Sequence, residues 1–187
     1  AIPIGITAAV YQDYPIDYFA RSLSVAMIAI PSFWIAMLII TAGTKFKFWT
    51  PQLNYVDLWQ DPVANFKIMW LPALLLGVSL SGGVMRLTRT QMLEIIREDY
   101  IRTARAKGLS QRVVLLRHAM RNAAIPIVTL VGLQVPVVIG GSVVLETLFS
   151  IPGVGRFTIN GIRNGDFPII QAVNLILAVV VIILAVG

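Results

Sequence analysis

The sequence IPIVTLVGLQVPVVIGGSVVL, residues 125–145, contains 21 residues and no charged side chain. A helix of about 20 apolar residues spans the roughly 30 Å hydrocarbon core of a bilayer, because each residue adds about 1.5 Å. Three further uncharged runs occur at residues 22–43, 68–85 and 167–187. Apolar segments in the cores of soluble proteins usually extend over only about 10–14 residues. We therefore predict an all-α polytopic membrane protein, a bundle with four full transmembrane spans.

The two ends of the sequence suggest that further chain belongs to this bundle. The first ten residues, AIPIGITAAV, are typical of the end of another membrane helix, and no Met precedes them. The last residues continue an apolar run. We expect residues 1–187 to form a single transmembrane domain with a partial span at its N-terminus, truncated there and trimmed at the C-terminus.

Charge is concentrated in one segment of the chain. The net charge is +6, and nine of the fifteen Lys and Arg residues lie within residues 86–121, which contain only three acids. The remainder of the chain has equal numbers of basic and acidic residues. Because basic residues close to membrane spans favour the cytoplasmic side, we predict that residues 86–121 form a cytoplasmic loop.

This basic loop has a pattern that predicts two helices separated by a turn. Gly108 interrupts a run of good helix formers, and Ser110 is a favourable first residue for a second helix. Ala104 and Ala106 make the end of the first helix slim. A slim helix end followed by glycine suits a groove on another protein, although a solvated loop that only sets the topology fits the charge equally well.

The side chains of the two helices lead to more detailed expectations. The upstream helix should be supported by the pairs Glu94/Arg97 and Glu98/Arg102, which have helical spacing. The downstream helix should present one apolar face, formed by Val113, Leu116 and Met120.

Two other functions are compatible with a basic loop in a membrane protein. The chain could belong to a channel or another helical bundle whose loop only sets the topology. It could also be a membrane anchor that binds nucleic acid or anionic lipid through the loop. Because the basic residues lie between membrane spans, we favour the topology signal and expect the lipid bilayer, and no nucleic acid, as a partner.

The residues needed for catalysis or for a metal site are missing from the sequence. It contains no G-x-x-x-x-G-K-[ST] phosphate loop, no Cys and a single histidine, His118. Asp13 and Asp17 are four residues apart, in what we expect to be a solvated loop. We therefore predict no catalytic residue, no metal ligand and no cofactor bound by this chain.

Polar residues in or next to the apolar runs are the candidates for a translocation path. Gln134 and Asn174 lie within these runs, and Glu146 directly follows the run 125–145; buried polar groups in a membrane usually serve function or helix packing. For Glu146 we favour a structural role, as a carboxylate that caps local structure near a helix end. Small residues at Gly77 and Ser81 should allow close helix packing, and Pro31 can kink the first span.

The stretch YIRTARAKGLSQRVVLLRHAMRNAAIP, residues 100–126, closely resembles the cytoplasmic signature of binding-protein-dependent ABC transporter permeases. The resemblance is to the dipeptide, oligopeptide and nickel branch. VVLETLFSIPGVGR (143–156), GIRNGDFPIIQA (161–172) and IPSFWIAMLI (30–39) are also similar to this branch and occur in its order. Arg102 replaces the leading acid of the broader signature, the outer loop after Gly43 departs from the usual pattern, and the first membrane helix and most of the second are absent.

This resemblance implies a function and a set of partners. The chain would be the permease subunit of an ATP-driven importer in the bacterial inner membrane, moving peptides or similar small solutes by alternating access. It would pair with a second permease, contact ATPase subunits that bind ATP and Mg, and receive substrate from an extracytoplasmic binding protein. The resemblance also implies an ATPase-coupling helix, formed by Thr103, Ala104, Arg105, Ala106, Lys107, Gly108 and Leu109.

Overall fold

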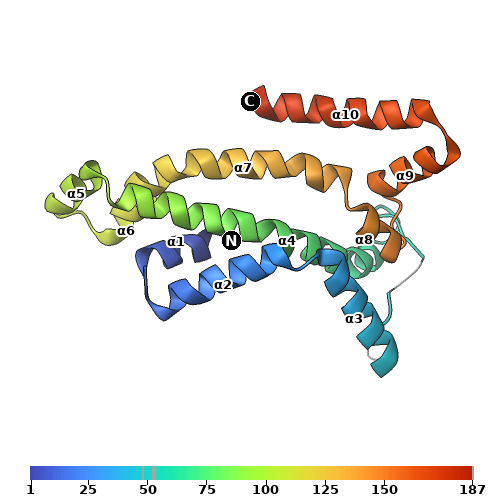
Figure 1. Ribbon diagram of the computed structural model, residues 1–187, viewed down its shortest axis with the longest axis horizontal. Coiled ribbons are helices and arrows are strands. Elements are labelled where there is room, and N and C mark those ends of the chain that lie inside the picture. The colour runs from blue at the N-terminus through green and yellow to red at the C-terminus, as the bar shows by residue number, and fades with distance from the viewer. Residues whose placement is uncertain (48, 52–53, 187) are drawn as a thin grey trace. The chain divides into compact units, whose positions relative to one another are not determined.

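The computed structural model describes residues 1–47, 49–51 and 54–186, with side chains through residue 183, and this part of the chain is helical without strands (Figure 1). Residues 48, 52, 53 and 187, in the predicted outer loop and at the end of the predicted last span, lie outside it. The elements are α1 (Ile2–Val10), α2 (Pro15–Ala29), α3 (Ser32–Phe46), α4 (Pro62–Ile96), α5 (Asp99–Ala106), α6 (Gln111–Val113), the π-helix η1 (Val114–Ala119), α7 (Met120–Gly140), α8 (Val143–Leu148), α9 (Val154–Asn164) and α10 (Phe167–Val186).

Long apolar helices confirm the predicted class, a helical membrane protein. Pro62–Ile96 and Gln111–Leu148 are each long and apolar enough to cross a bilayer, and they contain the predicted spans 68–85 and 125–145. Helices α2 and α3 supply a third crossing if they act as one broken span. The apolar helix over Phe167–Ile183 is shorter, so four full spans stay a prediction.

The predicted span 22–43 is not a continuous helix. Helix α2 ends at Ala29 and α3 begins at Ser32, with Pro31 in an extended conformation between them. Proline disfavours a helical residue before it and lacks an N–H for the helix ladder, so Pro31 separates two helices.

Helix α4 begins at a strong N-terminal signal. The Asp61 side chain accepts hydrogen bonds from the backbone N–H groups of Val63 and Ala64 at 2.9 and 3.0 Å, and Pro62 occupies the first turn. An aspartate cap followed by proline suits a helix start, because it satisfies free N–H groups and needs no N–H from proline. Pro72 lies inside α4 without ending it.

The described chain divides into two compact units. The first contains residues 1–29 and 80–131, and the second contains residues 30–79 and 132–187, so α4 and α7 each contribute to both. The core of the first unit combines residues from α1, α4, α5, η1 and α7: Ala9, Val84, Met92, Ile101, Ala104, Val114, Ala119, Ala123 and Ile127. The core of the second unit consists of Ala36, Leu71, Leu75, Leu145, Phe149 and Ile151.

Two glycines allow close helix packing in the first unit. A Cβ atom on Gly82 of α4 would lie 2.8 Å from the Ser24 carbonyl oxygen of α2, and one on Gly5 of α1 would lie 2.8 Å from the Met85 carbonyl oxygen of α4. Contacts this close leave no space for a side chain. Gly77, which we expected to serve this purpose, has nothing within 4 Å of the position of a Cβ atom.

A buried ion pair also joins α2 to α4 in the first unit. Arg89 donates from Nε and a terminal nitrogen to the two carboxylate oxygens of Asp17, at 2.5 and 2.8 Å. The Asp17 side chain is fully buried, so our expectation of a solvated loop aspartate was wrong. Both residues lie outside the predicted spans, and the hydrogen bond from Arg89 holds the pKa of Asp17 below its ordinary value.

Replacing Gly82 by alanine should destabilise the protein, whereas the same change at Gly77 should not. The new methyl group at Gly82 meets α2 and forces a shift, which typically costs about 1–3 kcal/mol. At Gly77, on the same helix, alanine enters open space and should raise stability by up to about 1 kcal/mol. Thermal unfolding of the full-length subunit in detergent measures both changes, and equal shifts for the two variants would contradict this packing.

Candidate functional site

The predicted coupling segment forms a helix, a turn and a second helix, as the sequence indicates. Helix α5 ends at Ala106, Gly108 has a left-handed φ of 77°, and Ser110 precedes α6. The N–H of Gly108 donates to the Arg105 carbonyl at 2.9 Å, and that of Leu109 donates to the Ala104 carbonyl at 3.4 Å. This pair of hydrogen bonds is the Schellman motif, in which glycine avoids the steric cost of a left-handed residue.

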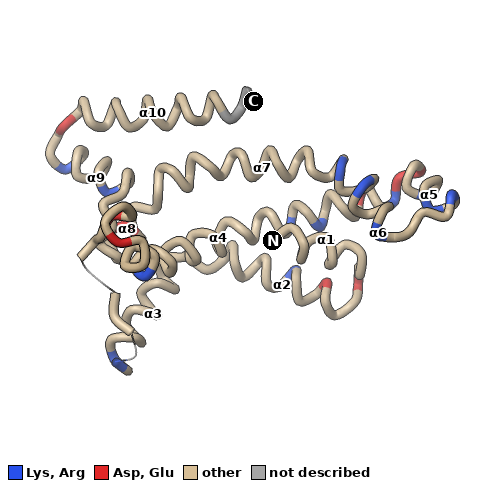
Figure 2. The backbone as a smooth tube through the Cα atoms, turned by 180° about the vertical axis from the view of Figure 1, so that it is seen from behind, with Lys and Arg blue, Asp and Glu red and all other residues tan. Residues whose placement is uncertain are grey.

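The segment is attached through one face and exposed on the other. Ala104, 6% exposed, packs with Ile101 into the core of the first unit. The other six residues of the predicted coupling helix are exposed: Thr103, Arg105, Ala106, Lys107, Gly108 and Leu109. Figure 2 shows Lys and Arg positions gathered along α5 and α6. The exposed surface therefore combines basic side chains with small ones, and Leu109 adds an apolar group.

The helix before the turn differs from the sequence prediction. Helix α4 ends at Ile96, and a break at Arg97 and Glu98 separates it from α5. Arg97 donates to the side chain of Gln12 at 3.0 Å, and Arg102 pairs with Asp99 at 3.3 Å. Among the residues described, neither the expected Glu94/Arg97 pair nor the expected Glu98/Arg102 pair forms, because Arg97 and Arg102 have these other partners.

The helix after the turn contains a π-helix that the sequence analysis missed. Val114 and Ala119 in η1 are fully buried, although they are five residues apart. A π-helix closes its hydrogen bonds from i to i+5, so residues five apart share a face. Val113 and Leu116 are exposed, so the predicted apolar face of Val113, Leu116 and Met120 is not the face that packs into the core. The sequence pattern was compared only with the spacing of an α-helix, so it did not predict that Val114 and Ala119 share a buried face.

Glu146 of α8 is a buried carboxylate in the second unit. One of its oxygens accepts a hydrogen bond of 2.6 Å from the backbone N–H of Arg156, in the first turn of α9. Gly141 and Gly153 enclose the carboxylate so closely that a Cβ atom on either glycine would overlap it. The geometry supports the structural interpretation of Glu146, because a carboxylate at a helix N-terminus satisfies a free N–H and interacts favourably with the helix dipole.

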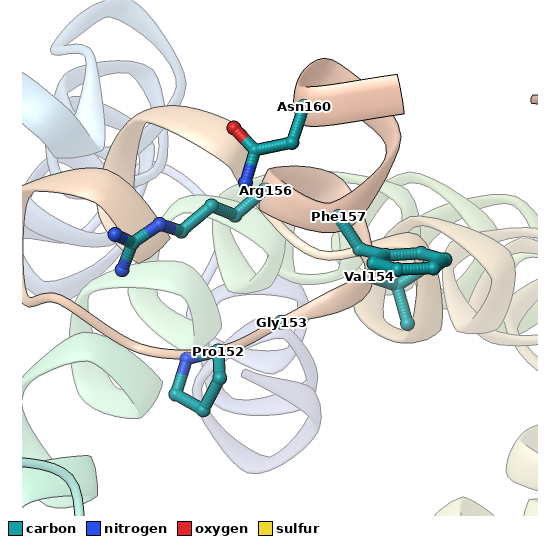
Figure 3. Close-up of a pocket in the computed structure, with 6 residues that line it drawn as sticks. All are labelled: Pro152, Gly153, Val154, Arg156, Phe157 and Asn160. Atoms are coloured by element: carbon teal, nitrogen blue, oxygen red, sulfur yellow. The ribbon is translucent and has the colours of Figure 1, made fainter. Parts of the chain in front are cut away.

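Next to this contact lies a pocket of about 550 Å³, lined by residues from the turn before α9 and from its first two turns. Figure 3 shows Arg156 and Phe157 extending from α9 in different directions, with Pro152 and Gly153 below them. The Arg156 backbone is held by Glu146, while its exposed side chain lines the pocket. The carboxylate thus fixes the backbone that presents this arginine.

The other two candidates for a translocation path are Gln134 and Asn174. Gln134 is half-buried on α7. Asn174 of α10 is exposed, and its amide donates to the Ile170 carbonyl of the same helix at 2.9 Å. A role of these side chains in a translocation path stays a prediction. Among the residues described, no group of three His, Asp or Glu side chains forms a candidate metal site.

These features define a helical membrane protein with an exposed basic helix–turn–helix segment. The family of inner membrane components of binding-protein-dependent transport systems matches the chain over residues 1–187. The chain belongs to this family, which confirms the resemblance first noted around Gly108.

Curated relatives match most of the chain. A protein of Brucella suis biovar 1 (strain 1330) named as a peptide transport system permease is 38% identical over 176 residues, which is 94% of this chain and 56% of the relative. The glutathione transport system permease protein of Escherichia coli (strain K12) is 39% identical over 168 residues, covering 90% of this chain and 52% of the relative. The chain therefore spans about half the length of these relatives.

Replacing Glu146 by alanine should loosen the start of α9. The change leaves the Arg156 N–H without its acceptor and opens a void among the glycines, at an expected cost of about 1–3 kcal/mol. Cleavage by trypsin after Arg156 should then become faster, because the protease needs an unfolded backbone. Thr147→Ala is the matched control, since Thr147 is the next residue on α8 and is exposed. Equal cleavage of wild type and Glu146→Ala would contradict this role.

Proposed function

We propose that the chain is part of a permease subunit of an ATP-driven ABC importer, which moves solutes across the inner membrane by alternating access. The observation that carries this proposal is the segment from Thr103 to Leu109, which is anchored on one side and exposed on the other. Family membership agrees with it, because this family consists of the inner membrane components of transport systems that depend on a binding protein.

The exposed segment is suited to an acidic, concave partner surface. Arg105 at the end of α5 and Lys107 directly after it are exposed, and neither has an ion pair within the part of the chain that the structure describes. Ala106 and Gly108 add little bulk, so the helix end can enter a groove. We propose that this groove belongs to an ATPase subunit, and that two such subunits bind the paired permeases.

The core beneath the segment supplies a mechanical connection to the membrane. Ile101 and Ala104 pack in one apolar cluster with Met92 of α4 and with Ala123 and Ile127 of α7. Protein interiors are close-packed, so displacement of α5 displaces these neighbours. Closure of the ATPase subunits would thus move the cytoplasmic ends of two long helices.

The proposed partners supply what the sequence does not contain. Its 187 residues include no phosphate loop, so ATP and Mg would be bound by the ATPase subunits. A second permease, identical or different, would complete the translocation path, and an extracytoplasmic binding protein would deliver the substrate. We propose peptides or peptide-like solutes as the substrate class, because relatives are named for peptide and glutathione transport.

Gly108→Trp should abolish binding of the cognate ATPase. The large side chain would occupy the tip of the segment, where nothing lies within 4 Å of the Cβ position. Co-purification of the ATPase with the full-length permease, and ATP hydrolysis stimulated by substrate-loaded binding protein, measure the effect. We expect both to fall at least tenfold.

Gly165→Trp provides a closely matched control for backbone strain. Gly165 has a φ of 67°, ends α9 with the same pair of hydrogen bonds, and also has nothing within 4 Å of its Cβ position. The predicted span 125–145 separates it from the cytoplasmic loop 86–121, so alternation across the bilayer predicts that it is extracytoplasmic and that ATPase binding should persist. Complex formation and transport that are unchanged by Gly108→Trp would refute the proposed coupling role.

A further inference from the structure

A cavity of about 280 Å³ in the first unit combines three arginines with an apolar wall. Arg21 of α2 and Arg86 and Arg89 of α4 line one part of it. Ala20, Val25 and Met85 line another part. No acidic residue lines this cavity among the residues described. Such a lining suits a ligand that has an anionic group joined to an apolar group.

The arginines around the cavity are not fully paired. Asp17 pairs with Arg89 and lies 3.3 Å from Arg21, and the exposed Asp13 lies 3.8 Å from Arg21. The Nε atom of Arg21 is buried and has no hydrogen-bond partner among the described residues. Arg86 makes no hydrogen bond or ion pair through its side chain within that same part of the chain. Two guanidinium groups therefore keep donors available for a ligand.

The position along the chain places these donors beside the membrane. Arg21 directly precedes the uncharged run 22–43, and Arg86 directly follows the run 68–85. Residues 86–121 are predicted to be cytoplasmic, and alternation across the two predicted spans 22–43 and 68–85 places Arg21 on the same side. Basic pockets between membrane helices on this side bind the headgroups of anionic lipids.

We propose that this cavity binds the phosphodiester headgroup of an anionic phospholipid from the cytoplasmic leaflet. Arg86 and Arg21 donate to the phosphate oxygens, while Met85 and Val25 contact the glycerol backbone. The cavity is smaller than most pockets for drug-sized ligands, so it holds the headgroup while the acyl chains stay in the bilayer. A free phosphate ion could accept the same hydrogen bonds from the arginines, but it would gain nothing from the apolar residues of the cavity. The proposal does not depend on ATPase binding.

Lipid binding by the full-length subunit in its complex tests this site. The complex, purified in detergent, is titrated with phosphatidylglycerol and with phosphatidylcholine, and bound lipid is detected by native mass spectrometry. We expect preference for phosphatidylglycerol, and about fivefold weaker binding in Arg86→Gln, since one basic residue near a membrane contributes roughly that factor. Arg86 takes no part in the Asp17 ion pair, so this variant should fold normally.

Two comparisons decide whether the cavity itself is responsible. Arg112→Gln removes an exposed charge of the same predicted cytoplasmic loop outside the cavity, and it should leave lipid binding unchanged. An equal loss in Arg112→Gln and Arg86→Gln, or equal binding of the two lipids, would overturn the proposal. Displacement of the lipid by millimolar inorganic phosphate would overturn it too, because the site would then be one for a free anion.

Discussion

The carboxylate of Asp17 is buried at the contact between α2 and α4, and the arrangement of the first unit depends on how its charge is neutralised. Two parallel hydrogen bonds from Arg89 do this, joining residues 72 positions apart in the chain. Removing one member of a buried pair usually costs about 3–5 kcal/mol, because the other charge is left without compensation. The close approach at Gly82 brings the same two helices together, so glycine packing and charge pairing act on one contact.

The second buried carboxylate is stabilised differently. Glu146 accepts a hydrogen bond from the backbone N–H of Arg156, and the glycines around it leave the space that its carboxylate occupies. The sequence predicts Asp17 in a solvated loop and places Glu146 directly after an apolar run. Their actual surroundings result from tertiary contacts, because sequence spacing alone does not place Arg89 next to Asp17.

The features that the sequence predicts well are local ones. Uncharged runs predict helices, the concentration of arginine between residues 86 and 121 predicts a separate exposed segment, and Gly108 and Ser110 predict the turn. The features that it misses depend on packing between distant residues. The break at Arg97 accompanies a contact with Gln12, and the buried face shared by Val114 and Ala119 follows from the π-helix. In α4, Gly82 packs closely against α2, whereas Gly77, also a glycine of an apolar run, has open surroundings.

Because η1 is a π-helix, the number of residues between the turn at Gly108 and α7 determines which side chains of this stretch are buried. Val114 and Ala119 share a buried face only because this stretch holds one more residue per turn than an α-helix would. Removing a single residue would rotate everything before it by about 100° relative to α7, since an α-helix has about 3.6 residues per turn. The exposed tip of the segment can therefore vary in side chains during evolution, whereas an insertion or deletion here would turn its exposed surface in another direction.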